Sequence, residues 1–242
     1  MQHAYYSQML FSLSIGLERA CKLAIALDYA LKNNRKFPCP AYFMKKGHHI
    51  SDLFKEVETI AGTLEISKLA QLMRTDIHDA ILKEASDFGE NITRYYNLDI
   101  LANPPSGYEA DPVSRWFTNV TGKVLCKHYT CYQADKHGFE IQQISKIFRN
   151  GAVLDVARED GTKINSMGDF HLHGRWTDYA APYTRMYILQ LARFLGEVLG
   201  QLGNKASPAL PVPYFPEIFG IFYNEDGYFK RRKTWIPDPR RY

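Results

Sequence analysis

Apolar residues recur every three or four positions in the first part of the chain, and this spacing constrains the fold more than any other feature. Such spacing puts one apolar stripe along the face of a helix. Because a long apolar stripe must be buried, the sequence predicts a helix that packs against other helices. The stripe consists of Leu10, Leu13, Leu17, Ala20, Cys21, Ala24, Leu27 and Leu31.

Two further helices are predicted between residues 51 and 96. Ser51 offers a side chain that can cap the first of them. The other begins at Asp76 and keeps helical spacing to about Tyr96. Between the two, residues 65–73 predict either a short helix or a continuation past Gly62. The apolar face of the helix that Ser51 caps consists of Leu53, Phe54, Val57 and Ile60.

The connection between the first two helices, residues 33–49, is basic and contains no acidic residue. If consecutive helices run up and down, this connection and the end of the third helix meet at one pole of a bundle, with Arg94 near His48. Cationic side chains and helix-start amides both bind phosphate groups. The sequence therefore predicts phosphate binding there, with a solvated polar loop as the alternative. We call this set the basic pole: Lys32, Arg35, Lys36, Lys45, Lys46, His48, His49 and Arg94.

Three short motifs in these helices resemble HEPN domains. The motifs are Leu17-Glu18-Arg19-Ala20-Cys21-Lys22, Lys46-Gly47-His48-His49-Ile50 and Arg94-Tyr95-Tyr96. In HEPN domains the first helix carries a Glu and a Lys, the second begins with a His-containing turn ahead of a Leu, and a later helix ends in an Arg-Tyr pair. The resemblance covers about the first hundred of the 242 residues.

The resemblance implies an up-down helical bundle that binds RNA or a nucleotide and associates as a homodimer. It also implies a role in bacterial defence, a toxin system or a mobile element. The Arg would clamp a phosphate and the Tyr would stack on a base. Alternatively, Tyr95 is part of the core and Arg94 pairs with Glu90 or Asp99. The residues predicted to bind nucleic acid or phosphate are Lys45, Lys46, His48, His49, Arg94 and Tyr95.

Many HEPN members are ribonucleases, which use an Arg and a His with four to six residues between them. No His in this chain has an Arg at that distance, and the nearest case is Arg74 and His78 with three intervening residues. Residues four apart share a helix face, so Arg74 would stabilise phosphate charge while His78 moves a proton. A metal-independent endoribonuclease with these two catalytic residues is therefore one alternative. An ordinary helix N-terminus flanked by Asp76 and Asp79 is another.

The second half of the chain also predicts helices. A break at residues 103–107 divides a bundle of residues 1–103 from an additional helical half, residues 104–242, that packs on it. Asp111 and Pro112 predict a capped helix start. Helices are expected at about 112–135, 141–150, 183–202 and 216–222, with a small β-hairpin within 152–176 and a turn at 226–227. The predicted fold class is mainly α.

Composition narrows the class of protein. The net charge of +4 permits anionic partners without requiring them. The cysteines at positions 21, 39, 126 and 131 include no Cys-x-x-Cys pair and form no dense disulfide framework, as expected of a reduced, cytoplasmic protein. No apolar run approaches the roughly 18 to 20 residues of a membrane span, so we expect no membrane partner.

Three further sequence features are weaker indications of function. Glu18 and Lys22 are four residues apart and predict a surface ion pair. His171 and His173 would share a face if extended, but no third ligand is evident, so neither a metal site nor a cofactor is predicted. Residues 230–233 form a basic run typical of solvated surface. A non-catalytic module that binds another protein is therefore the remaining alternative to an RNA-binding protein and a ribonuclease.

Overall fold

The computed structural model describes residues 2–90, 111–148, 157, 162–164 and 166–232 of the chain, and the described part is mostly helical. It contains no β-strand, and one isolated antiparallel bridge joins Ala157 to Lys163. The mainly α prediction is confirmed.

In the first half the helices are α1 (Gln2–Lys32), α2 (Pro40–Lys46), α3 (Ile50–Ala61) and α4 (Asp76–Gly89). In the second half they are α6 (Pro112–Trp116), the π-helical turn η2 (Phe117–Thr121), α7 (Gly122–His128), α8 (Cys131–Ile147), α9 (Met167–Ala206), α10 (Phe215–Phe219), the 3-10 turn η3 (Gly220–Phe222) and α11 (Asp226–Arg231).

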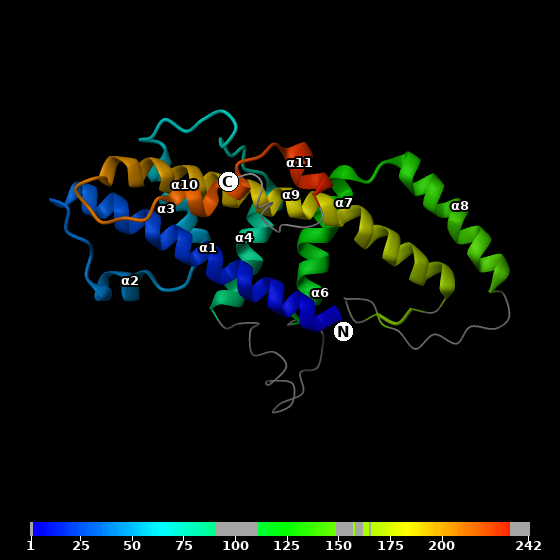
Figure 1. The fold of residues 1–242 in the computed structure, drawn as a ribbon. Coiled ribbons are helices and arrows are strands. Elements are labelled where there is room, and N and C mark those ends of the chain that lie inside the picture. Colours follow the sequence, from blue (N-terminus) through cyan, green and yellow to red (C-terminus); the bar gives the residue numbers. More distant parts are fainter. Residues whose placement is uncertain (1, 91–110, 149–156, 158–161, 165, 233–242) are drawn as a thin grey trace, which may run out of the picture.

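Two long helices, α1 and α9, organise the molecule. Helix α1 lies beside the C-terminal half of α9, and α3 and α4 pack against both (Figure 1). The N-terminal half of α9 runs next to α8 and forms an arm at one end of the molecule (Figure 1). One continuous apolar core contains residues from both sides of the predicted boundary, such as Leu17 and Cys21 of α1 and Leu191 and Leu195 of α9.

The helices of the first half begin and end differently from some of the sequence predictions. Ser51 lies inside α3, whose N-cap is His49, so the predicted cap is wrong. The basic connection contains α2, which begins at Pro40 as proline at a first helical position favours. Residues 65–73 are not helical. The third helix is observed from Asp76 to Gly89, and its predicted continuation to Tyr96 falls outside the described residues.

In the second half, packing overrides two local signals. Asp111 caps α6 as predicted, since its carboxylate accepts hydrogen bonds from the backbone N–H groups of Val113 and Ser114. Helix α9 begins at Met167 and continues through Pro182, although proline lacks an N–H and favours a break. Residues 167–176 of the region predicted to contain a small β-hairpin are therefore helical, and most of the remainder, residues 152–156, 158–161 and 165, falls outside the described residues. Residues 226–227 begin α11 and do not form a turn.

No helix in the described ranges combines the length and the apolar character needed to cross a membrane.

Candidate functional site

The start of α3 lies against both α1 and the end of α4. A Cβ atom added at Gly89 would lie 3.5 Å from the Cδ1 of Ile50 and 3.8 Å from both the carbonyl oxygen of His48 and the Cβ of Ser14. Gly47 precedes this contact with a φ of +63°, a left-handed conformation that glycine adopts without strain. The chain therefore turns sharply into α3 and presents His48 and His49 directly before its first turn.

His48 contacts the carboxylate that α1 supplies. Its Nδ1 lies 2.9 Å from Oε1 of Glu18, and the Nζ of Lys22 donates to the same oxygen at 2.7 Å. The i,i+4 ion pair predicted for Glu18 and Lys22 is thus present and includes a third group. Burial raises the pKa of Glu18, but the hydrogen bonds from Lys22 and His48 outweigh burial and leave the pKa lowered.

His49 also contacts a carboxylate, which comes from the end of α4. Its Nδ1 lies 2.5 Å from Oε1 of Glu90, the residue that follows α4. A carboxylate only accepts hydrogen bonds, so the proton on each ring is assigned to Nδ1. The Nε2 atom of each ring is then available to other groups. The side chains of His48 and His49 are 63% and 61% exposed, which leaves them accessible to a ligand.

The two lysines of the pole have different surroundings. Lys46 donates to Oε2 of Glu56 at 2.6 Å, and its Nζ lies 4.9 Å from the ring centroid of Tyr42. Lys45 is exposed and has no ion-pair partner within the described part of the chain. Lys45 is therefore the cation of this pair that is open to an anionic ligand.

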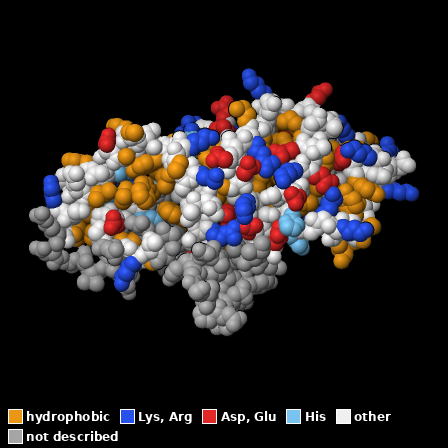
Figure 2. All heavy atoms as spheres, turned by 180° about the vertical axis from the view of Figure 1, so that it is seen from behind, with side chains coloured by type: hydrophobic (Ala, Val, Ile, Leu, Met, Phe, Trp, Pro, Cys, Tyr) orange, Lys and Arg blue, Asp and Glu red, His pale blue; other side chains and the backbone are white. Residues whose placement is uncertain are grey.

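The pole is less positive than its sequence predicts. The connection itself has no acidic residue, but Glu18, Glu56 and Glu90 reach it from α1, α3 and the end of α4. Figure 2 shows Lys and Arg side chains interspersed with Asp and Glu over much of the face it draws. Local spacing did not predict these carboxylate partners because they lie 10 to 41 positions from the residues that they contact.

Arg94 and Tyr95 lie outside the described residues. Their predicted roles, a phosphate clamp and a stacking platform, stay predictions.

Arg74 is engaged with carboxylates and not with the imidazole of His78. Its guanidinium donates to Oε2 of Glu58 at 2.5 Å and to Oδ1 of Asp79 at 2.5 Å, and it lies 5.8 Å from the ring of Phe54. Both carboxylates belong to helices that Arg74 connects, α3 and α4. This arrangement is that of a structural ion pair between helices.

His78 is buried and both of its ring nitrogens have partners. Its Nδ1 accepts the backbone N–H of Thr75 at 3.1 Å, which fixes the start of α4. Its Nε2 lies 2.9 Å from Oε1 of Gln190, whose Nε2 in turn donates to Asp226 at 2.8 Å. Because Nδ1 is an acceptor, the proton is on Nε2 and the ring is neutral. These contacts give His78 a role in connecting α4, α9 and α11.

Stability should therefore fall as the solution becomes acidic. Burial lowers the pKa of His78, although the hydrogen bond that its Nε2 donates to Gln190 opposes this effect. Below the unfolded value of about 6.5, the unfolded chain binds a proton that the folded protein does not, so unfolding becomes more favourable. We expect the free energy of unfolding to fall between pH 7.5 and 5.5 in urea titrations, and to fall less in the His78→Gln variant. His128 and His137 act in the same direction, since burial lowers the pKa of each. Parallel pH curves for the two proteins would contradict this account of His78.

His171 and His173 lie in α9, where residues two apart do not share a face. His171 and Arg175 both contact Glu140 of α8, at 3.2 and 2.9 Å. In the part of the chain that the structure describes, no three His, Cys, Asp or Glu side chains are grouped to hold a metal ion.

The chain was compared with protein-family models, with curated proteins and with solved structures, and no match was found in any of the three. The residues themselves therefore carry the functional argument.

Proposed function

We propose that this chain is a HEPN-like protein that binds a phosphate of RNA or of a nucleotide where α3 begins. The observation that carries the proposal is the pair of exposed imidazoles, His48 and His49, each held through Nδ1 by a carboxylate. We extend the proposal to a cytoplasmic role in bacterial defence or toxin–antitoxin function, which rests on the family resemblance.

The geometry favours an anion for two reasons. First, a ring held at Nδ1 keeps a fixed orientation before a ligand arrives. In the imidazolium form both ring nitrogens are donors, so its Nε2–H would be positioned to donate to a phosphate oxygen. Second, α3 has twelve residues, and its first backbone N–H groups carry the partial positive charge of a helix N-terminus. Lys45 adds a full positive charge at the end of α2, directly before this turn.

The test is binding of a 5′-fluorescein single-stranded RNA, followed by fluorescence anisotropy across a salt series. We expect about tenfold weaker binding for His48→Ala combined with His49→Ala, which corresponds to about 1.4 kcal/mol. Lys45→Ala should lower the slope of log K against log salt by about 0.7, the value for one phosphate contact to a single strand. The matched control is Lys146→Ala, because Lys146 is an exposed lysine of α8 far from the pole in sequence.

Unchanged affinity in the double His variant would contradict binding at this pole. Arg94→Ala in the same assay tests the predicted clamp. The homodimer implied by the resemblance also stays a prediction, which light scattering of the same purified protein would test.

RNA cleavage is the second candidate function, and one observation favours it. An imidazole held by a carboxylate is the arrangement that general bases use, and His48 and His49 both have it. The binding mixtures, run with EDTA on a denaturing gel, distinguish the two possible centres. Cleavage lost in His78→Ala alone would assign catalysis to Arg74 and His78, whereas cleavage lost in His48→Ala alone would assign it to the pole. Intact RNA in the wild-type lane would leave binding as the function.

A further inference from the structure

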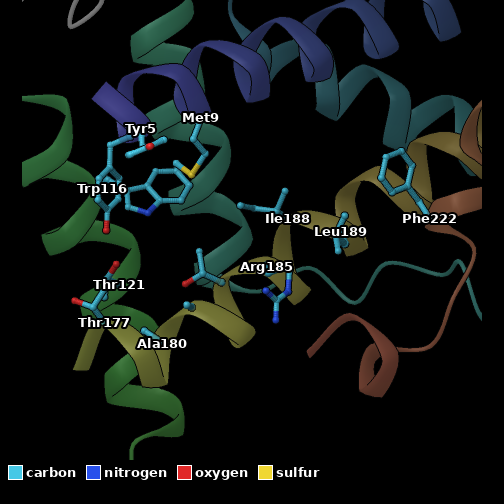
Figure 3. Close-up of a pocket in the computed structure, with 13 residues that line it drawn as sticks. Tyr5, Met9, Trp116, Thr121, Thr177, Ala180, Arg185, Ile188, Leu189 and Phe222 are labelled. Atoms are coloured by element: carbon cyan, nitrogen blue, oxygen red, sulfur yellow. The ribbon is translucent and has the colours of Figure 1, made fainter. Parts of the chain in front are cut away.

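A cavity of about 630 Å³ lies between α1, α6, η2, α9 and η3, and it shares no residue with the basic pole. Figure 3 shows Tyr5, Met9 and Trp116 gathered at one end and Phe222 at the other, with Ile188 and Leu189 of α9 between them. This volume is within the range of about 300 to 1,000 Å³ that is typical of small-molecule sites. The wall is mostly apolar, so a hydrocarbon group would be removed from water there.

One full charge borders this apolar wall. Arg185 of α9 lines the cavity, and its Nε and Nη2 donate to the carbonyl oxygens of Phe229 and Lys230 at 2.9 and 2.8 Å. Carbonyl groups satisfy N–H donors but carry no negative charge. No carboxylate in the described ranges lies within ion-pair distance of Arg185. Burial lowers the pKa of its guanidinium, which is the direction expected of a partly desolvated cation without a counter-charge.

Two other arginines with little exposed surface have carboxylate partners. Arg115 pairs with Glu84 and Asp87, and Arg193 pairs with Asp226 at 3.0 Å. The contrast matters because a partly buried charge is costly unless an opposite charge approaches it. A ligand that brings an anion to Arg185 would supply that charge.

We propose that this cavity binds a long-chain carboxylate, with the hydrocarbon chain along α9 and the carboxylate at Arg185. The apolar wall accounts for the chain, and the uncompensated guanidinium accounts for the head group. A cationic amphiphile of equal length would place like charges together, and a neutral alcohol would leave Arg185 without a counter-charge. The site therefore discriminates by the head group, and it does so independently of the function proposed for the pole.

The test is isothermal titration calorimetry of the full chain with decanoate, decanol and decyltrimethylammonium. We expect decanoate to bind at least tenfold more tightly than decanol, and decyltrimethylammonium to bind most weakly. In Arg185→Met, decanoate affinity should fall about tenfold to that of decanol, while decanol affinity is unchanged. Arg185→Lys keeps the charge and should keep the preference for decanoate.

A second variant distinguishes the effect of removing the charge of Arg185 from the effect of filling the cavity. Ala181 lines the cavity at an exposed position of α9, so Ala181→Trp should fill the cavity without unfolding the protein. We expect it to abolish binding of decanoate and decanol alike. Location is checked with a terminally brominated decanoate, which should quench tryptophan fluorescence in the wild type and not in Trp116→Phe.

Three results would overturn the proposal. They are equal affinity for decanoate and decanol in the wild type, unchanged decanoate binding in Arg185→Met, and a response to phosphatidylglycerol vesicles with none to free decanoate. The last result would identify attachment to a lipid surface instead.

Discussion

Replacing Arg115 by methionine is expected to lower the free energy of unfolding by about 3 kcal/mol. The guanidinium of Arg115 donates to both carboxylate oxygens of Glu84, at 3.0 and 3.3 Å, and it also contacts Asp87. The side chain of Glu84 is only 4% exposed, so its charge has little access to water. Among the described side chains, removal of Arg115 leaves that charge with the amide of Asn119, which donates to it at 2.7 Å.

The measurement is urea and thermal unfolding followed by circular dichroism. For a chain of this size, 3 kcal/mol corresponds to a fall of about 9 °C in Tm. The matched control is Lys83→Met, which removes the other cation beside Asp87. The side chain of Lys83 is 65% exposed and pairs with Asp87 across one helical turn, so its loss should cost only about 0.5 kcal/mol. Equal losses in the two variants would contradict the role given to burial.

The ion pairs of Asp87 with Lys83 and Arg115 also make the stability of the fold depend on pH. Burial raises the pKa of Asp87, but the hydrogen bonds from Lys83 and Arg115 outweigh burial, and the pKa is lowered. A carboxyl whose folded-state pKa is lowered stabilises the protein above its unfolded value of about 3.9, and this stabilisation is lost as the pH falls through the folded-state pKa. Arg115→Met should therefore lose less stability than the wild type on acidification to pH 3.

Replacing Phe54 by alanine is expected to lower the free energy of unfolding by about 4 kcal/mol. Phe54 is 0% exposed, and its ring centroid lies 5.6 Å from that of Phe194. These two rings join α3 to α9, so the substitution opens a cavity between a helix of each half. The guanidinium of Arg74, 5.8 Å from the same ring, also loses its aromatic neighbour.

Chemical denaturation of Phe54→Ala and Phe139→Ala gives a direct comparison. Phe139 of α8 is 63% exposed, so its truncation should change the unfolding free energy by no more than about 0.5 kcal/mol. A loss below about 1 kcal/mol in Phe54→Ala would mean that the contact between α3 and α9 contributes little to stability.

Local patterns were sufficient to predict much of the helical content. The stripe from Leu10 to Leu31 is the buried face of α1, and Asp111 with Pro112 begins a helix as capping rules require. The predictions failed where a local signal competed with packing. The sequence predicted a helix only over residues 183–202, yet α9 begins at Met167 and continues through Pro182. Ser51 indicated a cap, yet the start of α3 is fixed by the turn at Gly47 and the contacts around His48 and His49.

The position of the basic pole was predictable from the sequence, but the carboxylates that neutralise part of its charge were not. His48 and His49 were identified from a short motif, and in the structure both directly precede the first turn of α3. Their carboxylate partners, Glu18 and Glu90, come from different helices and could not be assigned from spacing. Arg185 was not identified at all, because a single arginine in an amphipathic helix gives no signal until its neighbours are known.

The sequence by itself determined that this chain is mainly helical and which residues of α1, α3 and α4 are buried, because helical periodicity and hydrophobicity act between near neighbours in the chain. The tertiary structure alone decided which charges are compensated. Ion pairing depends on distances of a few ångströms between residues that are far apart in sequence. Only the packed helices therefore distinguish a cation with a carboxylate partner, such as Lys46, from Arg185, which has none among the described residues.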